Sequence, residues 1–188
     1  MTMAHAAEID HDLAAIEATR QGDRSAFDEL VRRHGRWVKG VIYGVLGDGD
    51  RTDDVAQQVW QSAWGRIDSL RSVGQWRTWL YRLARNAAVD AGREQTRRRK
   101  LAKQVAQNPP AMRPATPDGQ VIGQEQHQAI MEAISALTAI YREPFVLRHL
   151  EGWSYQQIAE TMDLPVATVE TRLVRARQLL RATLTGKV

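Results

Sequence analysis

The segment SYQQIAETMDLPVATVETRLVRARQLL, residues 154–180, carries the most specific pattern in this chain. Ile158, Ala159 and Met162 have the spacing of the buried face of one short helix. Pro165 cannot continue that helix, and its fixed φ angle suits the first turn of a second helix. The apolar positions that would bury the second helix are Val169, Leu173 and Leu180. This spacing and turn chemistry predict a helix-turn-helix, and hence DNA binding.

The outward side of the second helix is polar and mostly basic. Its members are Thr168, Glu170, Thr171, Arg172, Arg175 and Arg177. The second helix of a helix-turn-helix enters the major groove, so we expect Glu170, Thr171 and Arg172 to reach base edges. Arg175 and Arg177 lie a turn later and are expected to meet phosphates. An ordinary helical hairpin with a solvated basic face is the alternative.

The composition limits what this chain can be. It has 188 residues, of which 43% are hydrophobic and 26% charged, enough for one ordinary domain or two small ones. The absence of cysteine excludes disulfides and thiolate metal sites. The start has no secretory signal pattern, and no apolar run approaches the roughly 20 residues of a membrane span. We therefore expect a cytoplasmic protein that does not insert into membranes.

The net charge of +4 is unevenly placed along the chain. Residues 1–30 are acidic, whereas residues 82–103 and 170–188 are strongly basic. Two separated basic zones indicate a polyanionic partner that is held in two places. Solvated helix faces are the alternative for each zone taken alone.

Helical periodicity runs through nearly the whole chain, and alternating β patterns are absent. The expected helices are 10–20, a second one capped by Ser25, 53–67, 75–92, 123–137, 142–152, 154–162 and 166–184. Four of the six prolines fall in QNPPAMRPATPDGQ, residues 107–120, where no periodicity is visible. We therefore predict an all-α fold of two small helical domains, 8–103 and 123–186, joined by a flexible proline-containing linker, 104–122.

The segment DDVAQQVWQSAW, residues 53–64, combines an apolar stripe with a polar side that lacks lysine. The polar side consists of Asp54, Gln57, Gln58 and Gln61. Amides and carboxylates do not suit DNA, but they suit a protein partner that offers arginines. A plain solvated face is the alternative.

The segment WRTWLYRLARNAAVDAGREQTRRRK, residues 76–100, places an apolar helix face beside a dense basic run. The apolar face is formed by Trp76, Trp79, Leu80, Leu83 and Ala87. The other side carries Thr78, Tyr81, Arg82 and Arg85. We expect the two tryptophans to act mainly as core that supports the preceding loop, rather than as stacking platforms for DNA bases.

These three segments, in this order and split by such a linker, resemble the successive signatures of bacterial extracytoplasmic function (ECF) sigma factors. The resemblance covers most of residues 10–184. It implies that the first segment binds the β′ clamp helices of core RNA polymerase. The residues that would do so are Asp53, Asp54, Gln57, Gln58 and Gln61. The C-terminal helix pair resembles the domain that reads the −35 promoter element with its outward residues and meets the β flap of the polymerase.

The resemblance also implies a −10 reading unit made of the loop 68–74 and the helix 75–92. Family members flip a base of the non-template strand into a pocket between such a loop and helix. The implied −10 contacts are Ser69, Arg71, Arg82, Arg85, Asn86, Arg93, Arg97 and Arg98. Extruding a base costs a few kcal/mol, and stacking on side chains offsets roughly 1–3 kcal/mol per base.

The chain departs from the family pattern at several positions. Asp163 stands at the turn where glycine is usual, but aspartate tolerates the left-handed backbone region, so we expect the turn to form. Glu170 occupies a commonly basic position, which is expected to change the −35 preference. Gln58 replaces a frequent acidic residue, which is expected to weaken one clamp contact.

Other classes of protein fit the sequence less well. A self-sufficient helix-turn-helix regulator that binds duplex DNA as a dimer is the alternative function, but no dimer-forming coiled coil is visible. No glycine-rich phosphate loop, catalytic triad or metal-ligand spacing stands out, so we expect no enzyme, cofactor or metal site. The family resemblance and the linker also imply an anti-sigma factor that wedges between the two domains.

Overall fold

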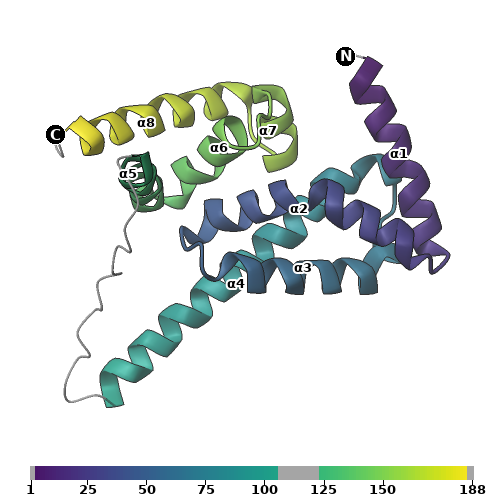
Figure 1. The fold of residues 1–188 in the computed structure, drawn as a ribbon, viewed down its shortest axis with the longest axis horizontal. Coiled ribbons are helices and arrows are strands. Elements are labelled where there is room, and N and C mark those ends of the chain that lie inside the picture. The colour runs from purple at the N-terminus through teal and green to yellow at the C-terminus, as the bar shows by residue number, and fades with distance from the viewer. Residues whose placement is uncertain (1–2, 106–122, 186–188) are drawn as a thin grey trace.

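The structure is a computed structural model, which describes residues 3–105 and 123–185. The N-terminal module consists of α1 (Met3–Arg20), α2 (Arg24–Leu46), α3 (Thr52–Arg66), the short 3-10 turns η1 (Ile67–Ser69) and η2 (Val73–Gln75), and α4 (Trp76–Val105). The C-terminal module consists of α5 (Gly123–Ala136), α6 (Ala139–His149), α7 (Tyr155–Met162) and α8 (Val166–Thr185). No strand occurs in these described ranges, and the predicted all-helical fold of two helical parts is confirmed (Figure 1). Most of the predicted linker, residues 106–122, lies outside the described residues.

The central helix of the N-terminal module is α2, which contacts α1, α3 and α4. The residues that fill the space between these helices and are fully shielded from solvent are Leu30, Val38, Ile42, Val59 and Leu80. Each such side chain contributes about 1.5–3 kcal/mol by leaving water. The apolar stripes predicted for α3 and α4 supply two of these residues, so the spacing in the sequence located the core correctly.

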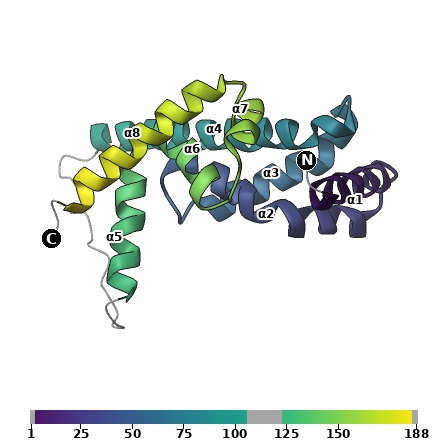
Figure 2. The ribbon, with the colours of Figure 1, turned by 90° about the horizontal axis from the view of Figure 1, so that it is seen from above.

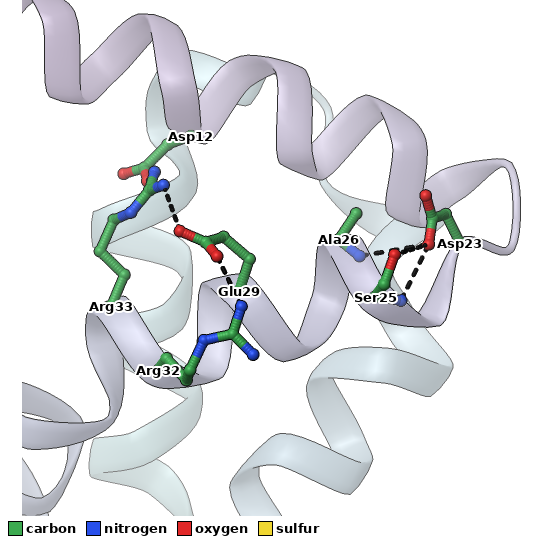
Figure 3. Close-up of polar contacts among 7 residues, drawn as sticks. All are labelled: Asp12, Asp23, Ser25, Ala26, Glu29, Arg32 and Arg33. Carbon is green, nitrogen blue, oxygen red and sulfur yellow. Dashed lines mark hydrogen bonds and ion pairs between the residues drawn. The ribbon is translucent and has the colours of Figure 1, made fainter.

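The start of α2 differs from the prediction. Asp23, not Ser25, is the N-cap residue, because its carboxylate accepts hydrogen bonds from the backbone N–H of Ser25 at 2.8 Å and of Ala26 at 3.2 Å (Figure 3). The Ser25 hydroxyl donates to the same carboxylate oxygen at 2.7 Å. These hydrogen bonds hold the pKa of Asp23 below its ordinary value.

Two other elements of the N-terminal module differ from expectation. The predicted loop 68–74 contains parts of two 3-10 turns, and α4 continues to Val105 instead of ending near residue 92. Along the extended part, Glu94 pairs with Arg97 at 2.9 Å and with Arg98 at 2.8 Å. Such pairs at i,i+3 and i,i+4 stabilise the helical conformation of this basic stretch.

A buried ion pair fastens α1 to α2. Asp12 lies 2.8 Å from the Arg33 guanidinium, and Glu29 also pairs with Arg33 at 2.7 Å (Figure 3). Asp12 also lies 3.0 Å from His34 Nε2. The ring of His34 is oriented by Trp37, whose indole N–H donates to His34 Nδ1 at 3.0 Å. Burial would raise the pKa of the Asp12 carboxyl, but His34 and Arg33 outweigh burial and hold that pKa below its usual value.

The two modules are in direct contact along α2 and α6, and α7 lies against α4 (Figure 2). One continuous apolar cluster spans both modules. The residues that the C-terminal module gives to it include Leu147, Trp153, Ile158, Val169 and Leu173. Across the contact, Trp153 meets Trp37 edge to face, with ring centroids 5.4 Å apart. A second, smaller cluster joins α5, α6 and α8.

The polar centre of this contact is Arg142 on α6, whose side chain is buried. Its guanidinium donates to the carbonyls of Gly44 at 2.9 Å and Val45 at 2.7 Å, at the C-terminal end of α2. It also donates to the carbonyls of Ser135 and Leu137, at the end of α5. Terminal carbonyls of a helix lack intrahelical partners and carry partial negative charge, so one cation satisfies two helix ends at once.

We expect Asp12→Asn to lower the free energy of unfolding by about 1–3 kcal/mol at neutral pH, because it leaves Arg33 and His34 without their buried carboxylate. The pKa of Asp12 is lower in the folded chain than in the unfolded chain. Its contribution is therefore present above the unfolded pKa and is lost as the pH falls through the folded pKa. Urea unfolding of both proteins should show a difference that shrinks as the pH falls below the ordinary pKa of an aspartate side chain. Asp28→Asn, at an exposed position of α2, is the control, and equal losses from both substitutions would contradict the role of Asp12.

Candidate nucleic-acid interface

The turn between α7 and α8 has the geometry that the sequence predicts. Ser154 caps α7 with a capping box, in which its hydroxyl accepts from the Gln157 N–H at 3.1 Å and Gln157 Oε1 accepts from the Ser154 N–H at 2.8 Å. Asp163 follows α7 with φ 57° and ψ 53°, which confirms that it takes the left-handed conformation. The Leu164 N–H then donates to the Ala159 carbonyl at 2.9 Å and closes the helix end.

The second helix of this pair, α8, begins at the proline turn. The Pro165 carbonyl accepts from the N–H of Thr168 at 2.9 Å and of Val169 at 3.2 Å. Val169 and Leu173 are fully shielded from solvent, and Leu180 is buried, as predicted. The helix is thereby held against α6 and α7 on one side, and its opposite side is left outward.

The predicted −35 residues occupy that outward side. Glu170, Thr171, Arg175 and Arg177 are exposed, and Thr168 and Arg172 are half-buried. Four of them, together with two residues of α6, line an open groove of about 590 Å³. Its lining includes Thr168, Thr171, Arg172, Arg175, Ile140 and Tyr141. Glu170 and Arg177 are exposed on α8 but do not line this groove, and the contacts of all six residues with DNA stay a prediction.

The predicted −10 residues of the loop and of early α4 line a pocket of about 460 Å³. Its walls include Ser69, Arg71, Gln75, Thr78, Trp79 and Arg82, and one residue of the C-terminal module, Glu160. Ser69, Arg71 and Arg82 thus come together, although thirteen positions separate the first from the last. The pocket lies within the about 300–1,000 Å³ typical of small-molecule sites.

Buried anchors hold the loop that forms this pocket. Ile67 and Leu70 are buried, and the Arg20 guanidinium of α1 donates to the Leu70 carbonyl. Beneath the loop, Trp76 is only 2% exposed and stacks on Trp79 with ring centroids 5.4 Å apart. The prediction that these tryptophans are core is confirmed for Trp76, while Trp79 is half-buried and also lines the pocket.

The structure corrects the prediction for Tyr81 and shows that Arg85 contacts the C-terminal module. Tyr81 was expected on the outward side of its helix, but it is 3% exposed because α6 covers it. Its hydroxyl donates to Glu143 Oε2 at 3.0 Å, and the Arg85 Nε–H donates to the same oxygen at 3.1 Å. Burial and the neighbouring carboxylate raise the pKa of Tyr81 strongly, so the phenol stays protonated. Arg85, a predicted DNA contact, is engaged by the C-terminal module here.

The remaining predicted −10 residues continue along exposed α4. Asn86, Arg93, Arg97 and Arg98 are exposed. Arg93 lies 3.7 Å from Asp90. Hydrogen bonds from Arg97 and Arg98 lower the pKa of Glu94 to about 2. Exposed pairs of this kind are weak, so these guanidinium groups can exchange a carboxylate for a phosphate.

The predicted polymerase-binding residues share the exposed side of α3. Asp53, Asp54, Gln57, Gln58 and Gln61 are exposed. Asp53 also pairs with Lys39 at 2.6 Å. The opposite side is buried through Val55, Val59 and Ala63, so the stripe predicted from the sequence is correct. What this polar face binds stays a prediction.

Three residues of the C-terminal module that shape the site escaped the sequence analysis. Arg142 and Glu143 are buried between the modules, and Glu160 lines the pocket beside α4. A signal was present in REPFVL, residues 142–147, where two adjacent charges directly precede apolar residues within one helix. Charged residues are rarely buried unless they are paired, but the sequence does not identify the residues that pair with Arg142 and Glu143.

Among residues 3–105 and 123–185, no group of three or more His, Cys, Asp or Glu side chains could hold a metal ion. In the same ranges, no helix combines the length and apolarity that a bilayer crossing requires.

Comparison with known proteins identifies the family. The profile of sigma-70 region 2 matches residues 30–98, and that of sigma-70 region 4 matches residues 127–180. The ECF RNA polymerase sigma-E factor of Haemophilus influenzae is 34% identical over 176 residues, which cover 90% of this chain and 93% of that protein. The Escherichia coli protein of the same name is 31% identical over 176 residues, with 90% and 92% covered.

Solved structures agree on the fold. CnrH, in complex with the cytosolic domain of CnrY, is similar with a TM-score of 0.68 and 24% identity, over 95% of this chain and 99% of that chain. The sigma factor RpoE of Bartonella quintana, in complex with the anti-sigma factor NepR, has a TM-score of 0.63 and 23% identity, over 85% and 96% of the two chains. The helix-turn-helix, the loop pocket and the two matched regions define a bacterial sigma factor of the sigma-70 class. Within that class, the chain belongs to the ECF sigma factors.

The left-handed backbone conformation at Asp163 restricts which side chains this position tolerates. We expect Asp163→Gly and Asp163→Asn to fold with at least wild-type stability, because both residues tolerate positive φ. Asp163→Val should lower the free energy of unfolding by about 1–2 kcal/mol, because a branched side chain clashes in that conformation. Urea denaturation measures all three variants. A valine variant as stable as the wild type would contradict this turn geometry.

Proposed function

We propose that this chain binds core RNA polymerase and directs it to promoters that carry two unlike elements. The observation that carries the proposal is that a sigma factor has a polar and basic outward face on α8 of one module and a pocket beside the basic helix α4 of the other. One surface is the outward face of α8, and the other is the loop pocket with the basic side of α4. A dimeric regulator would need only the first of these surfaces.

At the −35 element, α8 enters the major groove with its N-terminal half. Arg172 then donates to a guanine edge, and Glu170 accepts from a cytosine amino group. Thr168 and Thr171 serve as further contacts at the bases. Arg175 and Arg177 hold phosphates and fix the register of the helix without reading sequence.

At the −10 element, the pocket beside Trp79 receives a flipped base of the non-template strand. Ser69 and Arg71 approach it from the loop and Arg82 approaches it from α4, as their common lining of the pocket supports. Arg85, Asn86, Arg93, Arg97 and Arg98 extend the contact along the separated strand. The few kcal/mol needed to extrude the base are offset by contacts in the pocket and by phosphate pairing.

The exposed polar face of α3 docks on the β′ clamp helices of the polymerase, and the C-terminal module meets the β flap. The chain performs no chemistry itself and needs no cofactor, because the polymerase supplies the catalytic site. It acts in the bacterial cytoplasm, where the polymerase works. The sigma-E relatives, named as factors of RNA polymerase, support this assignment.

An anti-sigma factor regulates this chain. The RpoE structure named above pairs a sigma factor of similar fold with the anti-sigma factor NepR, which supports such a partner here. A partner that wedges between the modules, as the sequence analysis expects, has to separate α2 from α6 first, because these helices touch directly.

Run-off transcription with core polymerase on genomic fragments tests the proposal. We expect transcripts only when the chain and core enzyme are both present, and a footprint of two unlike elements about two helical turns apart. Core enzyme alone is the control. A symmetric footprint formed by the chain without polymerase would contradict the proposal and favour a dimeric regulator.

Substitutions of Arg172 and Arg175 on α8 distinguish a base contact from a phosphate contact. Arg172→Ala should cost about 1–3 kcal/mol at the preferred sequence and relax specificity at one base pair of the −35 element. Arg175→Ala should weaken binding nearly equally on all sequences and reduce the salt dependence. Holoenzyme binding to a set of single-base promoter variants distinguishes the two. A uniform loss for Arg172→Ala would make Arg172 a phosphate contact.

A further inference from the structure

The outward side of α8 carries an uncharged stripe that lies opposite its buried side. The buried residues of the helix are spaced at i, i+4, i+7 and i+11, and they are Val169, Leu173, Ala176 and Leu180. The same spacing, started two residues earlier, gives a row of exposed residues, which are Ala167, Thr171, Val174 and Gln178. Two residues turn an α-helix by about 200°, so the exposed row faces away from the core that holds the helix.

Val174 lies in the middle of this stripe, on a face whose other members are polar or small. Its side chain is 40% exposed, and the next residue along the helix, Arg175, is exposed as well. An exposed valine gives up the stabilisation that burial would provide. Single exposed apolar residues are common on protein surfaces. At the centre of a helix face that enters the major groove, however, such a side chain meets base edges instead of water.

Thr171 adds to the apolar character of the stripe. Its hydroxyl donates to the Ala167 carbonyl at 2.8 Å, so the proton of this hydroxyl is used within the helix. The groups that remain for an outside partner are the methyl group of Thr171, a lone pair of its oxygen and the methyl group of Ala167. From Ala167 to Val174, the stripe therefore offers mainly methyl groups.

Methyl groups on a recognition helix match one base in particular. In the major groove, thymine presents a methyl group at C5, and apolar side chains contact it. The charged residues on either side of the stripe, Glu170 and Arg175, suit polar base edges and phosphates instead. A methyl stripe with charged flanks therefore fits an element that has a thymine beneath the centre of the helix.

We infer that Val174 is a specificity-determining residue of the −35 contact, which recognises the 5-methyl group of a thymine. This inference rests on the proposed −35 function of α8 and adds to it a base that the arginines do not read. Removing the thymine methyl group loses the burial of one methyl-sized group, which corresponds to about a fourfold loss of affinity.

The test compares thymine with deoxyuridine, which lacks only the 5-methyl group. Holoenzyme is formed from the full chain and core RNA polymerase, and footprinting on a promoter fragment found by run-off transcription locates the upstream element. Each thymine of that element, on either strand, is then replaced by deoxyuridine, and the dissociation constant is measured. With the wild-type chain we expect one thymine, or two adjacent ones, to show a loss of about fourfold.

Val174→Ala should weaken binding to the thymine promoter by a similar factor and should abolish the difference between thymine and deoxyuridine at that position. An effect of deoxyuridine on DNA shape would persist in the variant, so the combined change isolates the direct contact. Val166→Ala is the matched control. Val166 is 39% exposed on the same helix, but it lies three residues before buried Val169 and outside the stripe, so its variant should keep the wild-type difference.

Deoxyuridine that binds as well as thymine at every position, or a thymine preference that survives Val174→Ala, would overturn the inference and leave the proposed function intact. An equal loss for Val174→Ala on all promoter variants would also overturn it, because Val174 would then read no base. A holoenzyme that protects no upstream element would overturn the proposed function, and this inference with it.

Discussion

The arrangement of the two modules depends on one buried cation at the ends of two helices. Arg142 donates to carbonyls at the C-termini of α2 and α5, where backbone acceptors have no partners of their own. A C-terminal helix end attracts a cation, and a guanidinium has enough donors in one plane to serve both ends. Gly47 completes the site, since a side chain there would collide with the guanidinium. Removing the Arg142 side chain would leave these buried carbonyls without hydrogen-bond donors.

That contact explains why the two halves share one core. Trp37, Val41 and Trp153 are buried between modules, and their exposure to water would oppose separation. The proposed function, however, requires the surfaces on α4 and α8 to reach separate DNA elements. Part of the contact, such as the apolar cluster, favours docking of the modules. Another part consists of ion pairs, such as Arg85 with Glu143, whose members can pair with opposite charges on DNA or polymerase instead. A balance of this kind allows one chain to be stable when closed and active when open.

Sequence reasoning succeeded wherever a local pattern decides the structure. The capped turn at Asp163, the apolar stripe of α3 and the core role of Trp76 all follow from neighbours along the chain. It failed where distant segments meet. Tyr81 looks outward on helical periodicity alone and is buried only because α6 covers it. The partners of Arg142 in α2 and of Glu143 in α4 lie far away in the chain, and no local spacing encodes such contacts. The N-cap of α2 is Asp23 and not Ser25; both residue types are preferred at N-caps, so the sequence alone did not distinguish them.

The central claim is that the free chain is closed and that it opens on the polymerase. Energy transfer between one dye on α2 and one on α8, followed while core RNA polymerase is added to the full chain, tests this claim most directly. The account predicts high transfer in the free chain and a single saturable fall to low transfer at one chain per polymerase. Transfer that is low from the outset, or that stays high in an assembled and active holoenzyme, would contradict it.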